Sequence, residues 1–211
     1  MASDSVHHPV FARLYAVMAR HEPRELVEHR RELLEGAAGR VIEVGAGSGA
    51  NFAHYPAEVA EVLAVEPESH LRAKALEAAA AAPVAVTVLE GTADRLPADD
   101  ASFDVAIASL VLCSVGSQQS ALGELRRVLR PGGELRFLEH VLAGSPRLAR
   151  RQARVDRLFW PRAFGGCHTA RDTPAAIRAA GFVVERERRL ELGPRFLPVA
   201  PHVLGLARAP R

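Results

Sequence analysis

The stretch VIEVGAGSGANFAHYP, residues 41–56, decides the fold of this chain. An apolar run leads directly into Gly45, Gly47 and Gly49, and helix-compatible residues follow at 50–53. This order predicts a buried strand, a tight glycine loop and a helix. Glycines at alternate positions allow positive φ and let a ligand approach the backbone without a Cβ in the way. The stretch therefore predicts a site for a cofactor that carries an adenosine.

Glu43 is an acidic residue inside the otherwise apolar strand that precedes the glycines. A buried carboxylate costs free energy unless it has a hydrogen-bonding or charged partner. A turn whose glycines serve backbone geometry alone would not need such a residue. We therefore expect Glu43 to have a partner and to belong to the site.

The composition indicates one ordinary globular domain. With 211 residues, of which 48% are hydrophobic, the chain can form a single domain, residues 1–211, with a large core. Its 27 basic and 25 acidic residues nearly balance, which gives little support for a nucleic-acid partner. Lys74 is the only lysine, so a Schiff base or a phosphate-binding lysine elsewhere is excluded. Cys113 and Cys167 cannot form a disulfide framework, and we expect a cytoplasmic protein.

Residues 1–39 precede the first predicted strand. Phe11 and Tyr15 share one face of a helix expected at 10–19, and Pro23 opens a second helix that runs to about residue 35. No apolar run approaches the roughly 20 residues of a membrane helix, so we expect neither a signal peptide nor a transmembrane segment. The first helix either packs in the core or acts as a lid over a substrate site.

The rest of the chain alternates between strands and helices. Strands are expected at residues 40–44, 61–65, 84–89, 103–108, 134–139, 182–190 and 202–207. Helices are expected at 69–82, at 117–129 before the stop signal RPGG (130–133), and from Pro174 onward with Thr173 as its cap. This alternation predicts an α/β fold with a mostly parallel sheet, helices on both faces and an antiparallel final strand pair.

The segment 144–171 differs from its surroundings because it is rich in arginine and amphipathic. Its arginines include Arg147, Arg150, Arg151, Arg154 and Arg157, next to apolar residues such as Leu158 and Trp160. We interpret it as an insertion on the substrate side, with a solvent-exposed helix face that covers the active site. Peripheral contact with a membrane surface stays open.

Two cofactors suit the glycine loop, a dinucleotide and S-adenosylmethionine. Glu66 ends the second strand, where an acid would hold the ribose hydroxyls of either cofactor. A dehydrogenase needs a hydride-handling group, yet neither Tyr15 nor Tyr55 has a lysine four residues on, and no large substrate domain follows. A methyltransferase needs neither feature.

Five stretches, taken in order, resemble the class I S-adenosylmethionine-dependent methyltransferases: VIEVGAGSGAN, VLAVEPE, GTADRLPADDASFDVAIASL, LRRVLRPGGELRFLEH and the final strand pair. The stretches LVLCSV (110–115), 160–167, Arg171 and PHVLGLA (201–207) are similar to the methyltransferase-like seven group, whose animal members methylate alkyl thiols. The resemblance implies a Rossmann-like, seven-stranded sheet with an antiparallel last strand. This sequence lacks the apolar N-terminal membrane segment of the animal members.

The resemblance also implies S-adenosyl-L-methionine as the cofactor. The glycine loop and the helix start after it would hold the methionine part, and Glu66 would accept both ribose hydroxyls. Many relatives have an aspartate where this chain has Thr92, at the adenine edge. The implied cofactor-binding residues are Glu43, Gly45, Ala46, Gly47, Gly49, Asn51, Glu66, Pro67, Thr92, Ala93, Asp94, Ser109 and Leu110.

The substrate side has to support an in-line displacement, for which the protein aligns donor and acceptor and excludes water. A thiol acceptor with a pKa near 8.5 has to lose its proton, so a nearby base or cation would help. His140, after the fifth strand, is the catalytic candidate. Residues placed on the substrate side are Phe11, Tyr15, Cys113, Cys167, His168 and Arg171.

Cys167 and His168 are adjacent and could suggest a metal site. No second pair of ligands follows at a fixed spacing, so we predict no bound metal.

We predict a methyltransferase for a small, fairly apolar acceptor, with a thiol as the first choice. An oxygen, nitrogen or carbon acceptor is the nearest alternative. A non-catalytic cofactor-binding protein is the alternative from another class. Nucleic acid is not expected as a partner, because the basic residues are not segregated outside 147–157.

Overall fold

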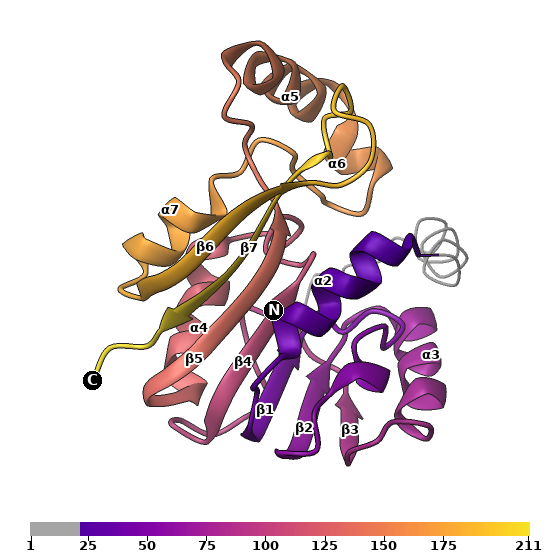
Figure 1. Ribbon diagram of the computed structural model, residues 1–211, viewed down its shortest axis with the longest axis vertical. Coiled ribbons are helices and arrows are strands. Elements are labelled where there is room, and N and C mark those ends of the chain that lie inside the picture. The colour runs from indigo at the N-terminus through magenta and orange to yellow at the C-terminus, as the bar shows by residue number, and fades with distance from the viewer. Residues whose placement is uncertain (1–21) are drawn as a thin grey trace, which may run out of the picture.

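The computed structural model describes residues 22–211. Its centre is a seven-stranded sheet in the order β3-β2-β1-β4-β5-β7-β6 (Figure 1). The strands are β1 (Gly39–Val44), β2 (Val59–Val65), β3 (Val86–Leu89), β4 (Phe103–Ser109), β5 (Leu129–His140), β6 (Val183–Glu191) and β7 (Pro201–Arg208). The helices are α2 (Arg24–Leu34), α3 (Ser69–Ala79), α4 (Gln118–Val128), α5 (Pro146–Leu158), α6 (Trp160–Ala163) and α7 (Thr173–Ala179). The predicted α/β class is confirmed.

Strands β1 to β5 pair in parallel, whereas β7 is antiparallel to both of its neighbours, β5 and β6. The predicted antiparallel strand pair is therefore confirmed. The strand order reverses at β1, which has β2 on one side and β4 on the other. In such sheets ligands bind outside the carboxyl ends of the strands at this switch point.

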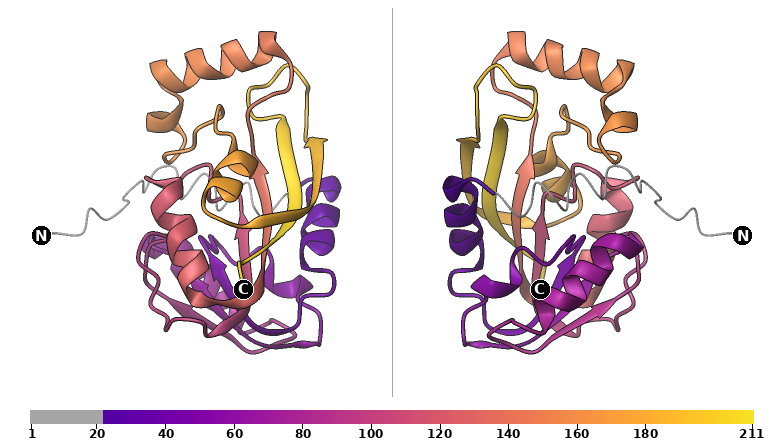
Figure 2. Two further views of the ribbon diagram at one scale, coloured as in Figure 1. Left: turned by 90° about the vertical axis from the view of Figure 1, so that its left-hand side faces the viewer. Right: turned by 90° about the vertical axis from the view of Figure 1, so that its right-hand side faces the viewer.

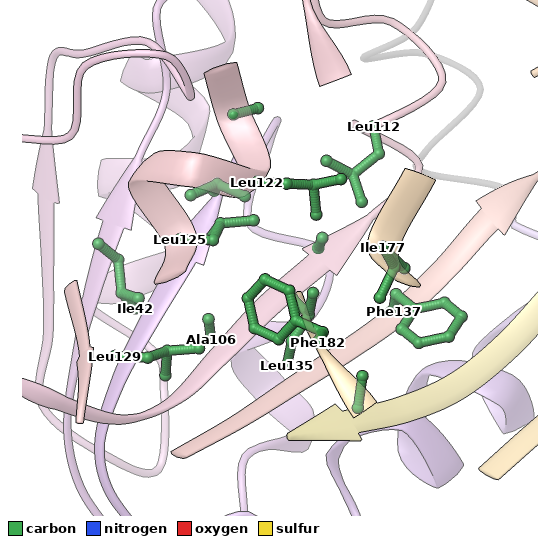
Figure 3. Close-up of a cluster of buried hydrophobic side chains, with 14 of the residues drawn as sticks. Ile42, Ala106, Leu112, Leu122, Leu125, Leu129, Leu135, Phe137, Ile177 and Phe182 are labelled. Atoms are coloured by element: carbon green, nitrogen blue, oxygen red, sulfur yellow. The ribbon is translucent and has the colours of Figure 1, made fainter. Parts of the chain in front are cut away.

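Helices cover both faces of the sheet (Figure 2). On one face α4 and α7 bury Leu122, Leu125 and Ile177 against strand residues that include Phe137 (Figure 3). On the other face Leu34 of α2 belongs to a second buried cluster. Each fully buried leucine of this kind stabilises the fold by about 1.5–3 kcal/mol. The two clusters fix the sheet, and with it the strand ends that carry the site.

The prediction of a helix directly after the glycine loop is wrong. Only a short 3₁₀ turn, η1 (Phe52–His54), forms there. Asn51 and Tyr55, on either side of the turn, both hydrogen-bond back to Glu43, and Pro56 holds Tyr55 in an extended conformation. These long-range contacts outweigh the local helix propensity. The helix N-terminus that was expected to face the cofactor carboxylate is therefore missing.

Strand β5 begins earlier than predicted. The RPGG stretch, residues 130–133, lies inside the strand, which starts at Leu129 directly after α4 and pairs there with Phe103. The pairing register shifts between Phe103 and Val105, and Gly132 has a φ of 76°. The irregular pairing bends the strand, and the glycine allows this conformation. The stretch ends the helix as expected, but it does not separate the helix from the strand.

The predicted cap of α7 is also wrong. Thr173 is the first helical residue, and the carboxylate of Asp172 accepts the capping hydrogen bond from the backbone N–H of Ala175 at 3.2 Å. Oγ1 of Thr173 instead accepts from Nε2 of Gln118 at 3.0 Å, which joins α7 to α4. Either residue type can cap a helix, so sequence alone could not separate these two neighbours.

Helix α5 lies in the predicted insertion, beyond the end of the sheet at which β5 terminates (Figures 1 and 2). Its buried residue is Gln152, whose Oε1 accepts from Ala143 N at 2.8 Å and whose Nε2 donates to Val141 O at 3.1 Å. These bonds attach the exposed helix to the segment that follows β5. Among residues 22–211 no helix is long and apolar enough to cross a membrane.

Candidate active site

The site is built where β1, β2, β4 and β5 end. Because parallel strands share an orientation, Gly45, Glu66, Ser109 and His140 all lie at the same edge of the sheet. These are residues that the sequence analysis selected. Phe11 and Tyr15, the predicted substrate-side residues of the first helix, lie outside the described residues.

Glu66 is a buried acid that organises the glycine loop. Its Oε2 accepts from the backbone N–H of Gly47 at 2.8 Å, and its Oε1 accepts from the N–H of Glu68 at 2.9 Å. Burial raises the pKa of Glu66, although both backbone hydrogen bonds oppose that rise. A carboxylate offers about four lone-pair sites, and two are in use here. Two remain for hydroxyl donors of a ligand.

The glycines of the loop have positive φ, as predicted. The values are 60° at Gly45, 58° at Gly47 and 81° at Gly49. A Cβ on Gly45 would lie 2.3 Å from Cγ2 of Val111, in the segment that follows β4. The glycine loop and this segment therefore pack against each other so closely that no side chain fits at Gly45.

Glu43 has the partners that its burial requires. Nδ2 of Asn51 donates to Oε1 at 2.9 Å, and the hydroxyl of Tyr55 donates to Oε2 at 2.6 Å. Burial raises the pKa of Glu43 to about 6, although both hydrogen bonds oppose that rise. The expectation that this acid is hydrogen-bonded is confirmed.

Relative to the wild type, Glu43→Gln is expected to gain stability as the pH rises from 4 to 8. The folded state binds the Glu43 proton more tightly than the unfolded state does, because its pKa rises from 4.5 to about 6. This contribution to stability is fully present below pH 4.5 and is lost as the pH rises through 6, a loss of roughly 2 kcal/mol. Urea unfolding of both proteins from pH 4 to 8 tests this. Parallel stability curves would contradict the expectation.

Arg30 is a site residue that the sequence analysis missed. It is 2% exposed, and its Nη1 donates to Oδ1 of Asn51 and to Oγ of Ser109, both at 3.0 Å. Its Nε and Nη2 bind Glu22 at 2.8 and 2.7 Å. One side chain thus joins α2 to the turn after β1 and to the end of β4. The sequence could have indicated its burial, because Arg30 lies three residues before Leu33 and therefore on the same, buried face of α2.

A cavity of about 500 Å³ opens beside Glu66. It is lined by Pro67, Glu90, Gly91, Thr92, Arg95, Leu96 and Pro97. Pro67 and Thr92 were predicted to contact the cofactor, and both line this cavity. Ala93 packs against the core instead, and Asp94 is exposed, so neither belongs to this lining.

The backbone turns sharply after β4. Leu110 has a φ of 59°, in the left-handed region that non-glycine residues rarely adopt. Its N–H donates to Leu138 O at 2.7 Å, which holds it against β5. Such strain persists only where the surroundings enforce it, and it is frequent at functional sites.

Glu139 holds the segment that follows Leu110. It is fully buried, and its Oε1 accepts from the N–H groups of Val111 at 3.0 Å and Leu112 at 2.9 Å. Its Oε2 accepts from the N–H of Cys113 at 3.1 Å. Burial raises the pKa of Glu139, against the effect of these three bonds. The sequence analysis missed this residue, because a single acid at the end of an apolar strand does not reveal its partners.

Cys113, His140 and Cys167 meet beyond this turn. Nδ1 of His140 lies 3.2 Å from Sγ of Cys167, and one potential ligand atom from each of the three residues lies within 4.8 Å of the others. Arg171 is adjacent, because its Nη1 donates to Leu112 O at 2.7 Å. The ring of His168 is not part of the group, since its Nδ1 faces Oδ2 of Asp156 at 3.8 Å.

The contacts within this group shift the pKa values of its members. The contact with Cys167, together with burial, raises the pKa of the Cys113 thiol. The same contact lowers the pKa of Cys167, and the indole of Trp160 adds to that lowering. Burial would lower the pKa of His140, but Cys113 and Glu139 outweigh it, so the net direction is upward. The contacts therefore make Cys167 the more acidic of the two thiols.

Comparison with known proteins identifies the family. Residues 42–137 match the family model described as a methyltransferase domain. The chain is 34% identical to human thiol S-methyltransferase TMT1B over 93% of its own length and 85% of that protein. It is 30% identical to human thiol S-methyltransferase TMT1A over 93% of its length and 82% of that protein.

A solved structure supports the fold independently. The YcgJ protein of Bacillus subtilis superimposes with a TM-score of 0.71 at 17% identity, covering 90% of this chain and 100% of that one. At this identity the likeness concerns the fold alone. The predicted resemblance is thus confirmed by the sequence relatives, and the chain belongs to the S-adenosylmethionine-dependent methyltransferase family that includes the thiol S-methyltransferases TMT1A and TMT1B.

Proposed function

We propose that this protein transfers a methyl group from S-adenosyl-L-methionine to a small, fairly apolar thiol. The observation that carries the proposal is the buried Glu66 carboxylate, which is bound to the glycine loop and lies beside a cavity lined by Pro67 and Thr92. The thiol follows from the names of the two relatives. The absence of a disulfide between Cys113 and Cys167 suits a reducing cytoplasm, where we place the protein.

The cofactor fits the residues of this edge. Glu66 retains two lone-pair sites for the ribose hydroxyls, and the cavity beside it is roomy enough for an adenine base. Gly45 to Gly49 allow the methionine part to approach the backbone.

The acceptor side lies beyond Ser109 and Leu110. When bound, the cofactor supplies a methyl group activated on a sulfonium, which an acceptor takes by in-line displacement. Leu110 and the segment held by Glu139 orient the acceptor. The acceptor thiol loses its proton to solvent beside His140 and Arg171, and the guanidinium of Arg171 stabilises the thiolate.

Calorimetry with S-adenosylhomocysteine tests the cofactor, and we expect binding that NAD does not match. Absence of binding, or tighter binding of NAD, would contradict the proposal. A panel of alkyl thiols, phenols and amines of similar size then tests the acceptor, and we expect turnover of thiols above the others. Preferential turnover of phenols or amines would replace the thiol by an oxygen or nitrogen acceptor. Binding without any turnover would favour the non-catalytic alternative.

A further inference from the structure

Three soft metal ligands meet at the acceptor side of the site. Cys113 comes from the segment after β4, His140 from the end of β5, and Cys167 from the loop between α6 and α7. The side chains of Cys113 and Cys167 are buried, at 1% and 7% exposure. The sequence analysis predicted no metal because it paired Cys167 with its neighbour His168. The fold provides two different partners.

The backbone holds the three residues in place independently of their side chains. The N–H of Cys113 donates to Glu139, the residue before His140, at 3.1 Å. The carbonyl of Cys113 accepts from the N–H of His168, the residue after Cys167, at 2.8 Å. Backbone hydrogen bonds thus connect Cys113 to the residue before His140 and to the residue after Cys167. A site whose ligands are fixed before the metal arrives binds it with little loss of conformational entropy.

The spacing suits a tetrahedral zinc ion. Zinc bound at about 2.3 Å to sulfur and about 2.0 Å to nitrogen places its ligand atoms roughly 3.5–3.8 Å apart. Nδ1 of His140 and Sγ of Cys167 are already 3.2 Å apart, and all pairs are within 4.8 Å. Side-chain movements of about 1 Å would bring the three ligand atoms to the separations that zinc requires. Two thiolates and one imidazole are ligands that zinc prefers.

We propose that Cys113, His140 and Cys167 bind one Zn²⁺ ion whose fourth position takes the acceptor thiol as a thiolate. The second half of this proposal rests on the proposed function, whereas the first half does not. The acceptor sulfur forms a bond to zinc in place of water, its S–H bond breaks, and the proton passes to solvent. A zinc site with three protein ligands and one open position is the arrangement found in catalytic zinc sites. Metal coordination deprotonates a thiol at neutral pH.

The surroundings suit the charge that such a site carries. Zn²⁺ with two cysteine thiolates and one substrate thiolate has a net charge of about −1. The guanidinium of Arg171 is bonded to Leu112 O, next to Cys113, and provides a compensating positive charge. The indole Nε1 of Trp160 is buried without a conventional hydrogen-bond partner, although the indole acts on Cys167. A thiolate at Cys167 would give this donor a strong acceptor.

Metal content of the full-length protein tests the first half of the proposal. We expect about one zinc per chain by elemental analysis, and cobalt substitution should produce thiolate-to-cobalt charge-transfer bands together with the d–d bands of a tetrahedral ion. Cys113→Ser, Cys167→Ser and His140→Ala should each retain less than about a tenth of the metal. His168→Ala is the matched control, because its ring faces Asp156, and it should keep all of it.

Adding an alkyl thiol to the cobalt protein tests the second half. We expect the d–d bands to shift and the charge-transfer band to grow, with half-maximal change near the KM for methylation. Unchanged bands would show that the thiol does not enter the metal site. A wild-type protein that binds no more cobalt than Cys167→Ser would overturn the site itself, and far-ultraviolet circular dichroism confirms that the variants are folded. Failure to bind S-adenosylhomocysteine, with metal present, would contradict only the proposed function.

Discussion

Replacing Glu66 by glutamine is expected to weaken the binding of S-adenosylhomocysteine by roughly 100-fold, which is about 2.7 kcal/mol of binding free energy. The carboxylate offers charge-assisted hydrogen bonds to two ribose hydroxyls, and each bond to a charged group contributes about 1.5–3 kcal/mol. Glutamine has only one acceptor oxygen. Its amide nitrogen would also face the N–H of Gly47 or of Glu68, which Glu66 now binds at 2.8 and 2.9 Å.

Calorimetric titration of both proteins with S-adenosylhomocysteine measures this change. Glu61→Gln is the matched control, because Glu61 lies in the same strand, β2, and is about half exposed. The control should bind within about twofold of the wild type, since its surface ion pair with Arg40 contributes little. Equal binding by Glu66→Gln and the wild type would remove Glu66 from the cofactor site. Thermal unfolding of the variant separates weaker binding from loss of the fold.

Glu66 also illustrates what the sequence predicted well. The features that were found are local: an apolar strand followed by a glycine loop, an acid at the end of the next strand, and an acid inside a buried strand that needs a partner. Each depends on a few neighbouring residues and on general rules for strands, turns and buried charge. The seven strands and the antiparallel final pair follow in the same way from periodicity and turn residues.

The features that were missed depend on residues distant in the chain. Arg30 reaches Ser109 across 79 positions, and nothing near either residue indicates this contact. Likewise Cys113 and His140 come together because Ser109 pairs with Leu138 in the parallel sheet, and Cys167 joins them because the N–H of His168 donates to Cys113 O. Contacts between residues this far apart depend on which strands pair, and no short stretch of sequence reveals that pairing. Sequence spacing alone therefore could not show that Cys113 and His140, and not His168, lie beside Cys167.

The 3₁₀ turn after the glycine loop shows a different limit. Residues 50–53 have adequate helix propensity, but intrinsic propensity amounts to less than about 1 kcal/mol per residue. Two hydrogen bonds to the buried carboxylate of Glu43, from Asn51 and Tyr55, outweigh it. Where a buried carboxylate needs hydrogen-bond donors, the nearby backbone adopts the conformation that brings those donors to it. This is also why the conformation of Leu110 could not be anticipated without Glu139.

Replacing Glu139 by alanine is expected to lower the free energy of unfolding by about 3–5 kcal/mol. The side chain accepts from three backbone N–H groups, of Val111, Leu112 and Cys113, and those of Leu112 and Cys113 lie in fully buried residues. Alanine leaves all three donors without their acceptor and opens a small cavity. The segment that directly follows Leu110, whose φ is an unfavourable 59°, would then lose the acceptor that holds it.

A graded series separates hydrogen bonding from volume. Glu139→Gln keeps the volume and one acceptor oxygen, which can still serve Val111 and Leu112, but it turns an amide N–H₂ toward the N–H of Cys113. Its loss should therefore lie between zero and the loss of the alanine variant, at about 1–3 kcal/mol. Urea unfolding measures both, with the exposed Glu185→Ala of β6 as the control that should change by less than about 1 kcal/mol.

Activity gives the series its second readout. Because the Glu139 carboxylate fixes the segment that carries Leu110 and Cys113, Glu139→Gln should lose thiol methylation at a temperature where the variant is still fully folded. Its affinity for S-adenosylhomocysteine should fall much less, since Glu66 and the cavity beside it lie at the ends of other strands. Equal losses of cofactor affinity and turnover would place the effect of Glu139 on the whole sheet edge. A loss of turnover without a matching loss of cofactor affinity would show that Glu139 acts on the acceptor side.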